Sequence, residues 1–134
     1  MKGPIRNIQQ LPIRFTEDSR EIEVIDVIQV GDSLYRIEEN PIFTELVAFG
    51  DTILVREEPD TYVYLETVRT SDYNRFSWLL SKEATDSQQL DAVKSRITAL
   101  HGRWEHVFGG VFIVNIPKDA PYEIHDEMNR IIGL

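Results

Sequence analysis

The segment EEPDTYVY places three carboxylates beside two tyrosines. Glu57, Glu58 and Asp60 fall in a predicted turn, and Tyr62 and Tyr64 share one face of the strand predicted to follow it. Tyrosine supplies rigid contact area at protein interfaces, and carboxylates attract basic groups. These five residues are therefore the predicted protein-binding residues. The alternative, slightly favoured by the pattern itself, is that the tyrosine face covers the core.

Two other acids raise the question of catalysis. Asp26 interrupts the apolar face of a predicted strand, and Asp51 follows Gly50 where another strand begins. For Asp26 the pattern favours a partnered structural role, and whether either acid lines a pocket is left open. For Asp51 it favours a turn in which the carboxylate accepts hydrogen bonds from nearby backbone N–H groups. The sequence contains no P-loop, G-x-S-x-G or G-x-G-x-x-G motif, so no catalytic residue is predicted.

Metal and cofactor sites are also not predicted. The chain has no cysteine, and His101, His106 and His125 lack the spacing of a zinc site, which needs three or four converging ligands. Surface or capping roles are the favoured interpretation of all three histidines. Gly109 and Gly110 indicate a hairpin turn, because no lysine and helix follow them as in a phosphate-binding loop.

Charge narrows the choice of partners. The chain of 134 residues carries 23 acidic and 14 basic residues, a net charge of −9, and its basic residues are scattered singly. Nucleic-acid binding is therefore disfavoured, whereas a basic protein partner is allowed. A simpler explanation of the net negative charge is that it keeps the protein soluble. No apolar run is long enough to cross a membrane, and the N-terminus lacks the apolar core of a signal peptide, which predicts a soluble, cytoplasmic protein without membrane contact.

The first part of the chain is predicted to be mostly β. The length suits a single domain spanning residues 1–134, with residues 1–10 as a loose tail and residues 11–80 mostly β. The N-terminal half is predicted to form a strongly bent antiparallel sheet or partial barrel. Because proline has no N–H to donate, Pro12 predicts that LPIRF is an edge strand. A homodimer could form through such an edge. Pro41 takes the chain out of the sheet into a helical turn or an irregular crossover. Strands are predicted at LPIRF and at residues 21–30, 34–38, 52–57, 61–69 and 74–80.

Residues 81–134 are predicted to be an α+β half. Leu90, Val93, Ile97 and Leu100 follow a helical spacing, with a capping box from Thr85 to Gln88 and a stop at Gly102. A hairpin follows, and a second helix has Pro121 in its first turn. From Arg75 on, the order strand–helix–hairpin–helix predicts a ferredoxin-like arrangement that lacks its last strand. The fold class is therefore α+β.

The pattern YRIEENPIF…FGDTILV, followed by GRWEHVFGGVFIVNIP, resembles a family of small bacterial domains of unknown function. The resemblance spans roughly residues 21–134 and supports the predicted fold, but it implies no activity. Members of that family often carry a glycine-rich turn after the strand at 61–69, where this chain has TSDYN. The residues that carry the resemblance are Tyr35, Arg36, Pro41, Phe43, Gly50, Asp51, Glu105 and Pro117.

Three functions are ranked from these observations. The first is a non-enzymatic protein-binding domain, in the form of an inhibitor or immunity protein that neutralises a basic bacterial toxin. That form follows from the habits of small acidic bacterial proteins and from no particular residue. The second is a regulatory module that binds a small molecule inside the barrel or between the halves. The third and weakest is a hydrolase centred on Asp26 or Asp51.

Overall fold

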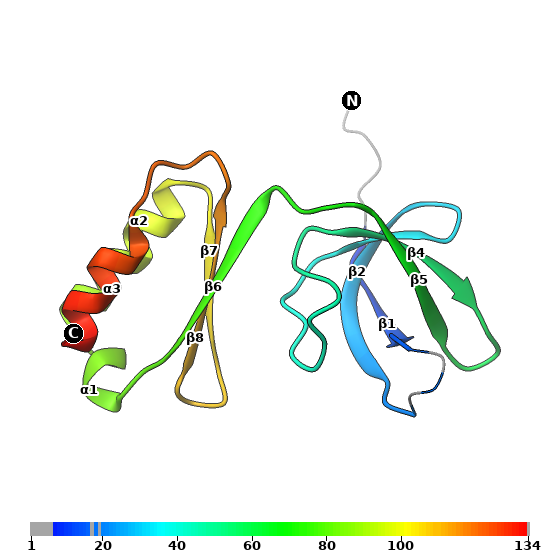
Figure 1. Ribbon diagram of the computed structural model, residues 1–134, viewed down its shortest axis with the longest axis horizontal. Coiled ribbons are helices and arrows are strands. Elements are labelled where there is room, and N and C mark those ends of the chain that lie inside the picture. The colour runs from blue at the N-terminus through cyan, green and yellow to red at the C-terminus, as the bar shows by residue number, and fades with distance from the viewer. Residues whose placement is uncertain (1–6, 17, 19, 134) are drawn as a thin grey trace. The chain divides into compact units, whose positions relative to one another are not determined.

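The computed structural model describes residues 7–16, 18 and 20–133 and has an α+β fold (Figure 1). The chain divides into two compact units, residues 1–72 and residues 73–134. Each unit has its own cluster of buried hydrophobic side chains. This division does not decide whether the chain behaves as one domain, so the predicted single domain stays a prediction.

The first unit is a closed barrel of five strands in the order β1-β2-β3-β4-β5. Neighbouring strands are antiparallel, except that β1 and β5 close the barrel as a parallel pair. The sequence predicted a bent sheet or a partial barrel, whereas the structure has a closed barrel. The strands are β1 (Gln9–Arg14), β2 (Glu23–Gly31), β3 (Leu34–Ile37), β4 (Thr52–Glu57) and β5 (Tyr62–Arg69).

The first strand is not an edge strand, contrary to the prediction. Ile13 pairs with Tyr62 of β5, and β1 pairs with β2 on its other side. Pro12 has no N–H to donate, but its carbonyl accepts a hydrogen bond of 2.9 Å from the Thr61 hydroxyl. The predicted route to a homodimer through β1 is thereby closed, and a homodimer through another surface stays a prediction.

The prediction that residues 1–10 form a loose tail is wrong at Gln9, because Gln9 belongs to β1. Residues 1–6 lie outside the described residues.

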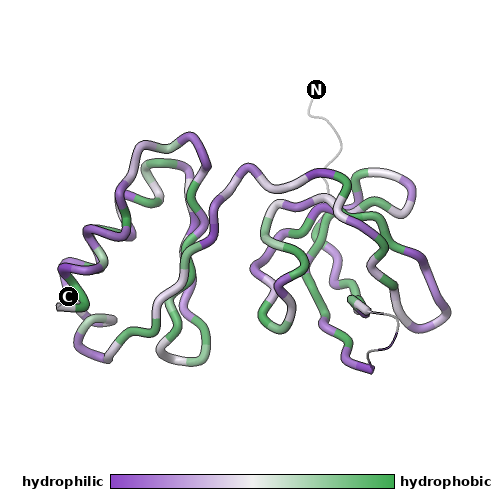
Figure 2. Tube along the Cα trace, in the orientation of Figure 1, coloured by the Kyte–Doolittle hydropathy of each residue, from purple (hydrophilic) through white to green (hydrophobic). Residues whose placement is uncertain are grey.

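The barrel interior is filled by side chains that alternate along each strand. In β2, Ile25 and Val27 are fully buried, whereas Ile22 just before the strand and Val24 are about half exposed. Apolar residues run through the strands in Figure 2, and Val47 adds to this core from outside the strands. The buried core of this unit consists of Leu11, Ile13, Ile25, Val27, Tyr35, Ile37, Val47, Ile53 and Val55.

The connection between β3 and β4 is irregular and contains no helix. It turns back at Gly50, which has a φ of +91° and donates its N–H to the carbonyl of Ile37. The buried Asp51 carboxylate then accepts hydrogen bonds from the N–H groups of Ala48, at 2.8 Å, and of Ser71, at 2.7 Å. The predicted turn at Asp51, with its carboxylate bound to backbone N–H groups, is confirmed.

The second unit is a three-stranded antiparallel sheet with three helices. β8 lies between β6 and β7, and the core lies between the sheet and the helices α2 and α3 (Figure 1). The strand predicted to open this half, from Arg75 on, is β6, and it pairs with β8. The predicted element order is present, but the ferredoxin-like relationship stays a prediction. The elements are β6 (Tyr73–Leu79), α1 (Lys82–Thr85), α2 (Gln88–Ala99), β7 (Arg103–Val107), β8 (Val111–Pro117) and α3 (Ile124–Ile132).

The ends of the helices differ in detail from the predictions. α2 is capped by Ser87, whose hydroxyl accepts the N–H of Leu90, because Thr85 is used in the short helix α1. Pro121 precedes the N-cap of α3, Glu123, and so lies outside its first turn. Within the described residues, no helix is long and apolar enough to cross a membrane.

Two residues, His101 and Gly102, end helix α2, where the sequence predicted Gly102 alone. His101 takes the left-handed conformation, with a φ of +65°, that was expected of Gly102. Gly102 follows and donates its N–H to the carbonyl of Ile97. A Cβ atom on Gly102 would lie 2.6 Å from the carbonyl oxygen of Asn115 in β8. Glycine is therefore required here by the close approach of the helix end to the sheet.

We expect Asp51→Ala to lower the free energy of unfolding by about 2–4 kcal/mol, because it leaves two buried N–H groups without an acceptor. Urea unfolding followed by far-UV circular dichroism measures the change. Asp60→Ala is the matched control, since Asp60 is exposed in a turn and its loss should change stability by less than about 0.5 kcal/mol. An Asp51→Ala protein as stable as the control would contradict this role.

Candidate functional site

A small polar pocket opens at the end of the barrel where β2 turns into β3 and β4 into β5. Glu57 and Tyr62 lie opposite each other in the β4–β5 pair, and both line it. Its volume is about 260 Å³. We call it the tyrosine pocket, and the residues that line it are Gln29, Asp32, Ser33, Tyr35, Val55, Glu57 and Tyr62.

Two phenol rings form the inner part of this pocket. The rings of Tyr35 and Tyr62 meet edge to face, with centroids 6.0 Å apart. Tyr35 is only 7% exposed. Its burial, followed by the neighbouring Tyr62 and then by the Glu57 carboxylate, raises the pKa of Tyr35. The Tyr35 hydroxyl therefore stays protonated at neutral pH and can donate as well as accept a hydrogen bond.

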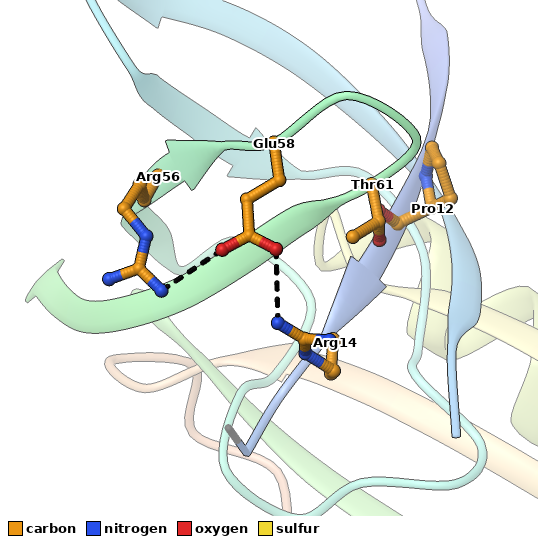
Figure 3. Close-up of polar contacts among 5 residues, drawn as sticks. All are labelled: Pro12, Arg14, Arg56, Glu58 and Thr61. Atoms are coloured by element: carbon orange, nitrogen blue, oxygen red, sulfur yellow. Dashed lines mark hydrogen bonds and ion pairs between the residues drawn. The ribbon is translucent and has the colours of Figure 1, made fainter. Parts of the chain in front are cut away.

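The remaining predicted binding residues do not line the tyrosine pocket. The Glu58 carboxylate lies between two guanidinium groups, 3.1 Å from Arg14 Nη2 and 3.1 Å from Arg56 Nη2 (Figure 3). Asp60 is exposed in the turn. Tyr64 packs against the core, with its ring on Phe15 and its hydroxyl 2.8 Å from the Thr67 hydroxyl. The structure thus brings two of the five predicted residues together.

Neither candidate for a hydrolytic acid lies in the tyrosine pocket. Both oxygens of Asp51 are occupied by backbone N–H groups, as described above. Asp26 lies between the core residues Ile25 and Val27, so its side chain is directed to the outer side of β2. Its backbone N–H donates to the Glu39 carboxylate at 2.6 Å.

The three histidines lie apart in the second unit. His101 is exposed at the end of α2, and His125 packs edge-on against Phe76 and Trp78. No group of three or more His, Asp or Glu side chains that could hold a metal ion occurs among residues 7–16, 18 and 20–133.

His106 lies within an aromatic cluster. Its ring centroid is 5.0 Å from that of Phe112 and 5.8 Å from that of Trp104, and Lys94 Nζ lies 4.3 Å from the centre of the Trp104 ring. Neither ring nitrogen of His106 has a hydrogen-bond partner among the described residues. Burial, and then the charge of Lys94, lower the pKa of His106. The folded protein therefore favours the neutral imidazole.

A second concavity was not predicted from the sequence. It has a volume of about 520 Å³ and is formed by residues 15–16, residues 21–23 and the β3–β4 connection. The only local signal for it is the apolar spacing in IFTELVAF, which indicates a helical turn equally well. We call it the apolar groove, and its lining residues are Phe15, Thr16, Glu21, Ile22, Glu23, Phe43, Thr44 and Leu46.

The fold and the sites define an α+β protein with a five-stranded barrel, a helix-covered sheet and two concavities on the barrel. The model of the family described as "Domain of unknown function (DUF4265)" matches residues 23–131, and the chain belongs to this family. A crystal structure of a hypothetical protein from Neisseria gonorrhoeae is similar in fold, with a TM-score of 0.66 and 14% sequence identity over 96% of this chain and 87% of that one. None of the curated proteins matches the chain in sequence.

We expect His106 to reduce stability at mildly acid pH. Because its pKa is lowered in the folded state, the unfolded chain binds a proton below about pH 6.5 more readily than the folded protein does, so stability is lost as the pH falls. Tryptophan fluorescence during urea unfolding at pH 7.5 and 5.5 reports on this unit, which contains both Trp78 and Trp104.

His106→Phe should lose less stability between these two pH values than the unchanged protein. His101→Asn is the control, because His101 is exposed and asparagine tolerates its left-handed backbone. An equal loss in His106→Phe and in the unchanged protein would rule out this contribution.

Proposed function

We propose that this chain is a non-enzymatic, cytoplasmic protein-binding domain that recognises a basic protein partner. One form of this function is an inhibitor or immunity protein that covers the active site of a basic toxin. The observation that carries the proposal is the convergence of carboxylates and phenols in the tyrosine pocket.

The chemistry of this pocket suits a lysine or arginine side chain. Asp32 and Glu57 can accept charge-assisted hydrogen bonds, which are about twice as strong as neutral ones. The half-buried ring of Tyr62 offers a contact to the aliphatic stem and to the cation. None of the seven lining residues is basic. A buried cation at the centre of an interface, surrounded by aromatic contacts, is a common energetic anchor.

The net charge supports the same partner at longer range. A chain with a net charge of −9 attracts a basic protein before contact, which raises the association rate at low salt. Glu57 and Asp60 are exposed beside the pocket and belong to this field. Glu58 contributes less, because it is paired with Arg14 and Arg56.

The second candidate is a regulatory module that binds a small organic cation in the same pocket. The interior of the barrel is occupied by its own side chains, so this candidate relies on the pocket at the barrel end. Tight binding of agmatine, putrescine or arginine would raise the melting temperature, and only this candidate requires such a shift.

The second unit has no assigned part in this proposal. Its strand β8 lies between β6 and β7, which are joined through helices. On that ground we propose that the unit is related to ferredoxin-like folds without their last strand.

We expect the tagged protein to capture a basic partner from a lysate of its host at low salt, and less of it at moderate salt. Glu57→Lys should reduce the association rate with that partner about tenfold or more at low salt, because it reverses a charge inside the pocket. Surface plasmon resonance measures the rate.

Glu66→Lys makes the same charge change on β5, outside the tyrosine pocket, and is the matched control. Equal rates for the two variants would remove the pocket from the proposal. Capture of no partner, together with a melting shift produced by a small cation, would favour the regulatory module instead.

A further inference from the structure

Three large apolar side chains around the apolar groove are exposed to solvent. Phe43 is 77% exposed, Leu46 is 53% exposed and Ile22 is 50% exposed. Single exposed apolar residues are ordinary on protein surfaces, but several around one concavity mark a contact site. The concavity has a volume of about 520 Å³, enough to take a large side chain.

Hydrogen bonds to the Glu23 side chain hold the backbone that presents Phe43. The Glu23 carboxylate accepts the N–H of Ile42 at 2.7 Å and the N–H of Phe43 at 3.1 Å. This pair of hydrogen bonds ties the β3–β4 connection to the first residue of β2. A backbone that is already ordered loses little conformational entropy on binding, so the arrangement favours recognition.

From this arrangement we infer that the apolar groove is a docking site for a segment of a protein partner that presents a large apolar side chain next to basic residues. The apolar side chain inserts between Phe15, Ile22 and Phe43, which all line the groove. The neighbouring basic residues lie against the acidic side of the groove.

Charge complementarity identifies the occupant. Glu21 and Glu23 line the groove, and Glu45 is exposed between the lining residues Thr44 and Leu46. The exposed Arg20 precedes Glu21, so the acids outnumber the bases here by three to one. None of the eight lining residues is basic. An acidic segment would therefore be repelled here, whereas an apolar segment with lysines or arginines gains both apolar burial and favourable charge.

The shape favours a protein segment over a small molecule. Small-molecule sites usually enclose most of their ligand, whereas this groove is open and its apolar side chains project from its rim. Such projecting side chains can surround an inserted side chain and exclude water from it, as they do around the anchors of protein interfaces.

The apolar groove and the tyrosine pocket are separate sites. Glu23 lies at the start of β2, whereas Gln29 of the tyrosine pocket lies near its end. The two sites can therefore be tested independently, and the failure of one leaves the other standing.

The test is an NMR titration of the ¹⁵N-labelled full chain with three blocked peptides, Lys-Leu-Lys-Phe-Lys, Lys-Ser-Lys-Ser-Lys and Glu-Leu-Glu-Phe-Glu. The first peptide should shift the amide signals of Ile42 and Phe43, which mark the groove. The second lacks the apolar side chains and the third carries the wrong charge, so neither should shift these signals.

Variants locate the binding. Phe43→Ala and Leu46→Ala should each weaken binding of the first peptide about fivefold or more. Leu79→Ala is the matched control, because Leu79 is 80% exposed but lies in the second unit, and it should change the affinity less than about twofold. Glu57→Gln, in the tyrosine pocket, should likewise leave these groove signals and their affinity unchanged. Spectra that overlay away from the groove establish that the variants are folded.

Four results would overturn the inference. The acidic peptide could shift the groove signals as strongly as the basic one, or both groove variants could bind as the unchanged protein does. Benzyltrimethylammonium, a small aromatic cation, could bind the groove as tightly as the peptide, which would assign the site to a small molecule. A loss of binding in Glu57→Gln alone would place the peptide in the tyrosine pocket.

Discussion

The Asp51 carboxylate joins segments of the first unit that are far apart in the sequence. One oxygen accepts the N–H of Ala48 in the β3–β4 connection, and the other accepts the N–H of Ser71 just after β5. The backbone of Asp51 adds two more bonds, to Ile37 and again to Ala48. An irregular connection has no ladder to satisfy its backbone groups, so a buried acceptor at this point is what allows the chain to leave the sheet and return.

Glu23 has a comparable role on the other side of the same connection. It binds the N–H groups of Ile42 and Phe43, so the connection is held by one carboxylate at each end. Glu58 links β1 to β4 through Arg14 and Arg56. Three of the acids in this chain therefore build the barrel. The number of acidic residues in a sequence says nothing about which of them are free to meet a partner.

The sequence predicted the local elements and missed what depends on distant pairing. β2 to β5, α2 and the β7–β8 hairpin follow from the alternation or helical spacing of apolar residues. Closure of the barrel depends on Ile13 meeting Tyr62, a pairing that is not encoded locally. Glu57 and Tyr62 were found because they lie in one segment, whereas Tyr35 and Asp32 reach the same pocket from another hairpin.

Closure of the barrel also decides where binding can take place on the first unit. Because Ile25, Val27, Ile37 and Ile53 fill the interior, a ligand has only the rims and outer faces to use. Glu57 and Glu58 are adjacent, yet Glu57, the last residue of β4, lines the tyrosine pocket, whereas Glu58 in the turn binds the arginines. Glu57 lies with two tyrosines near the end of β2, and the exposed Phe43 lies near its start. A basic partner with an apolar anchor matches the chemistry of both ends.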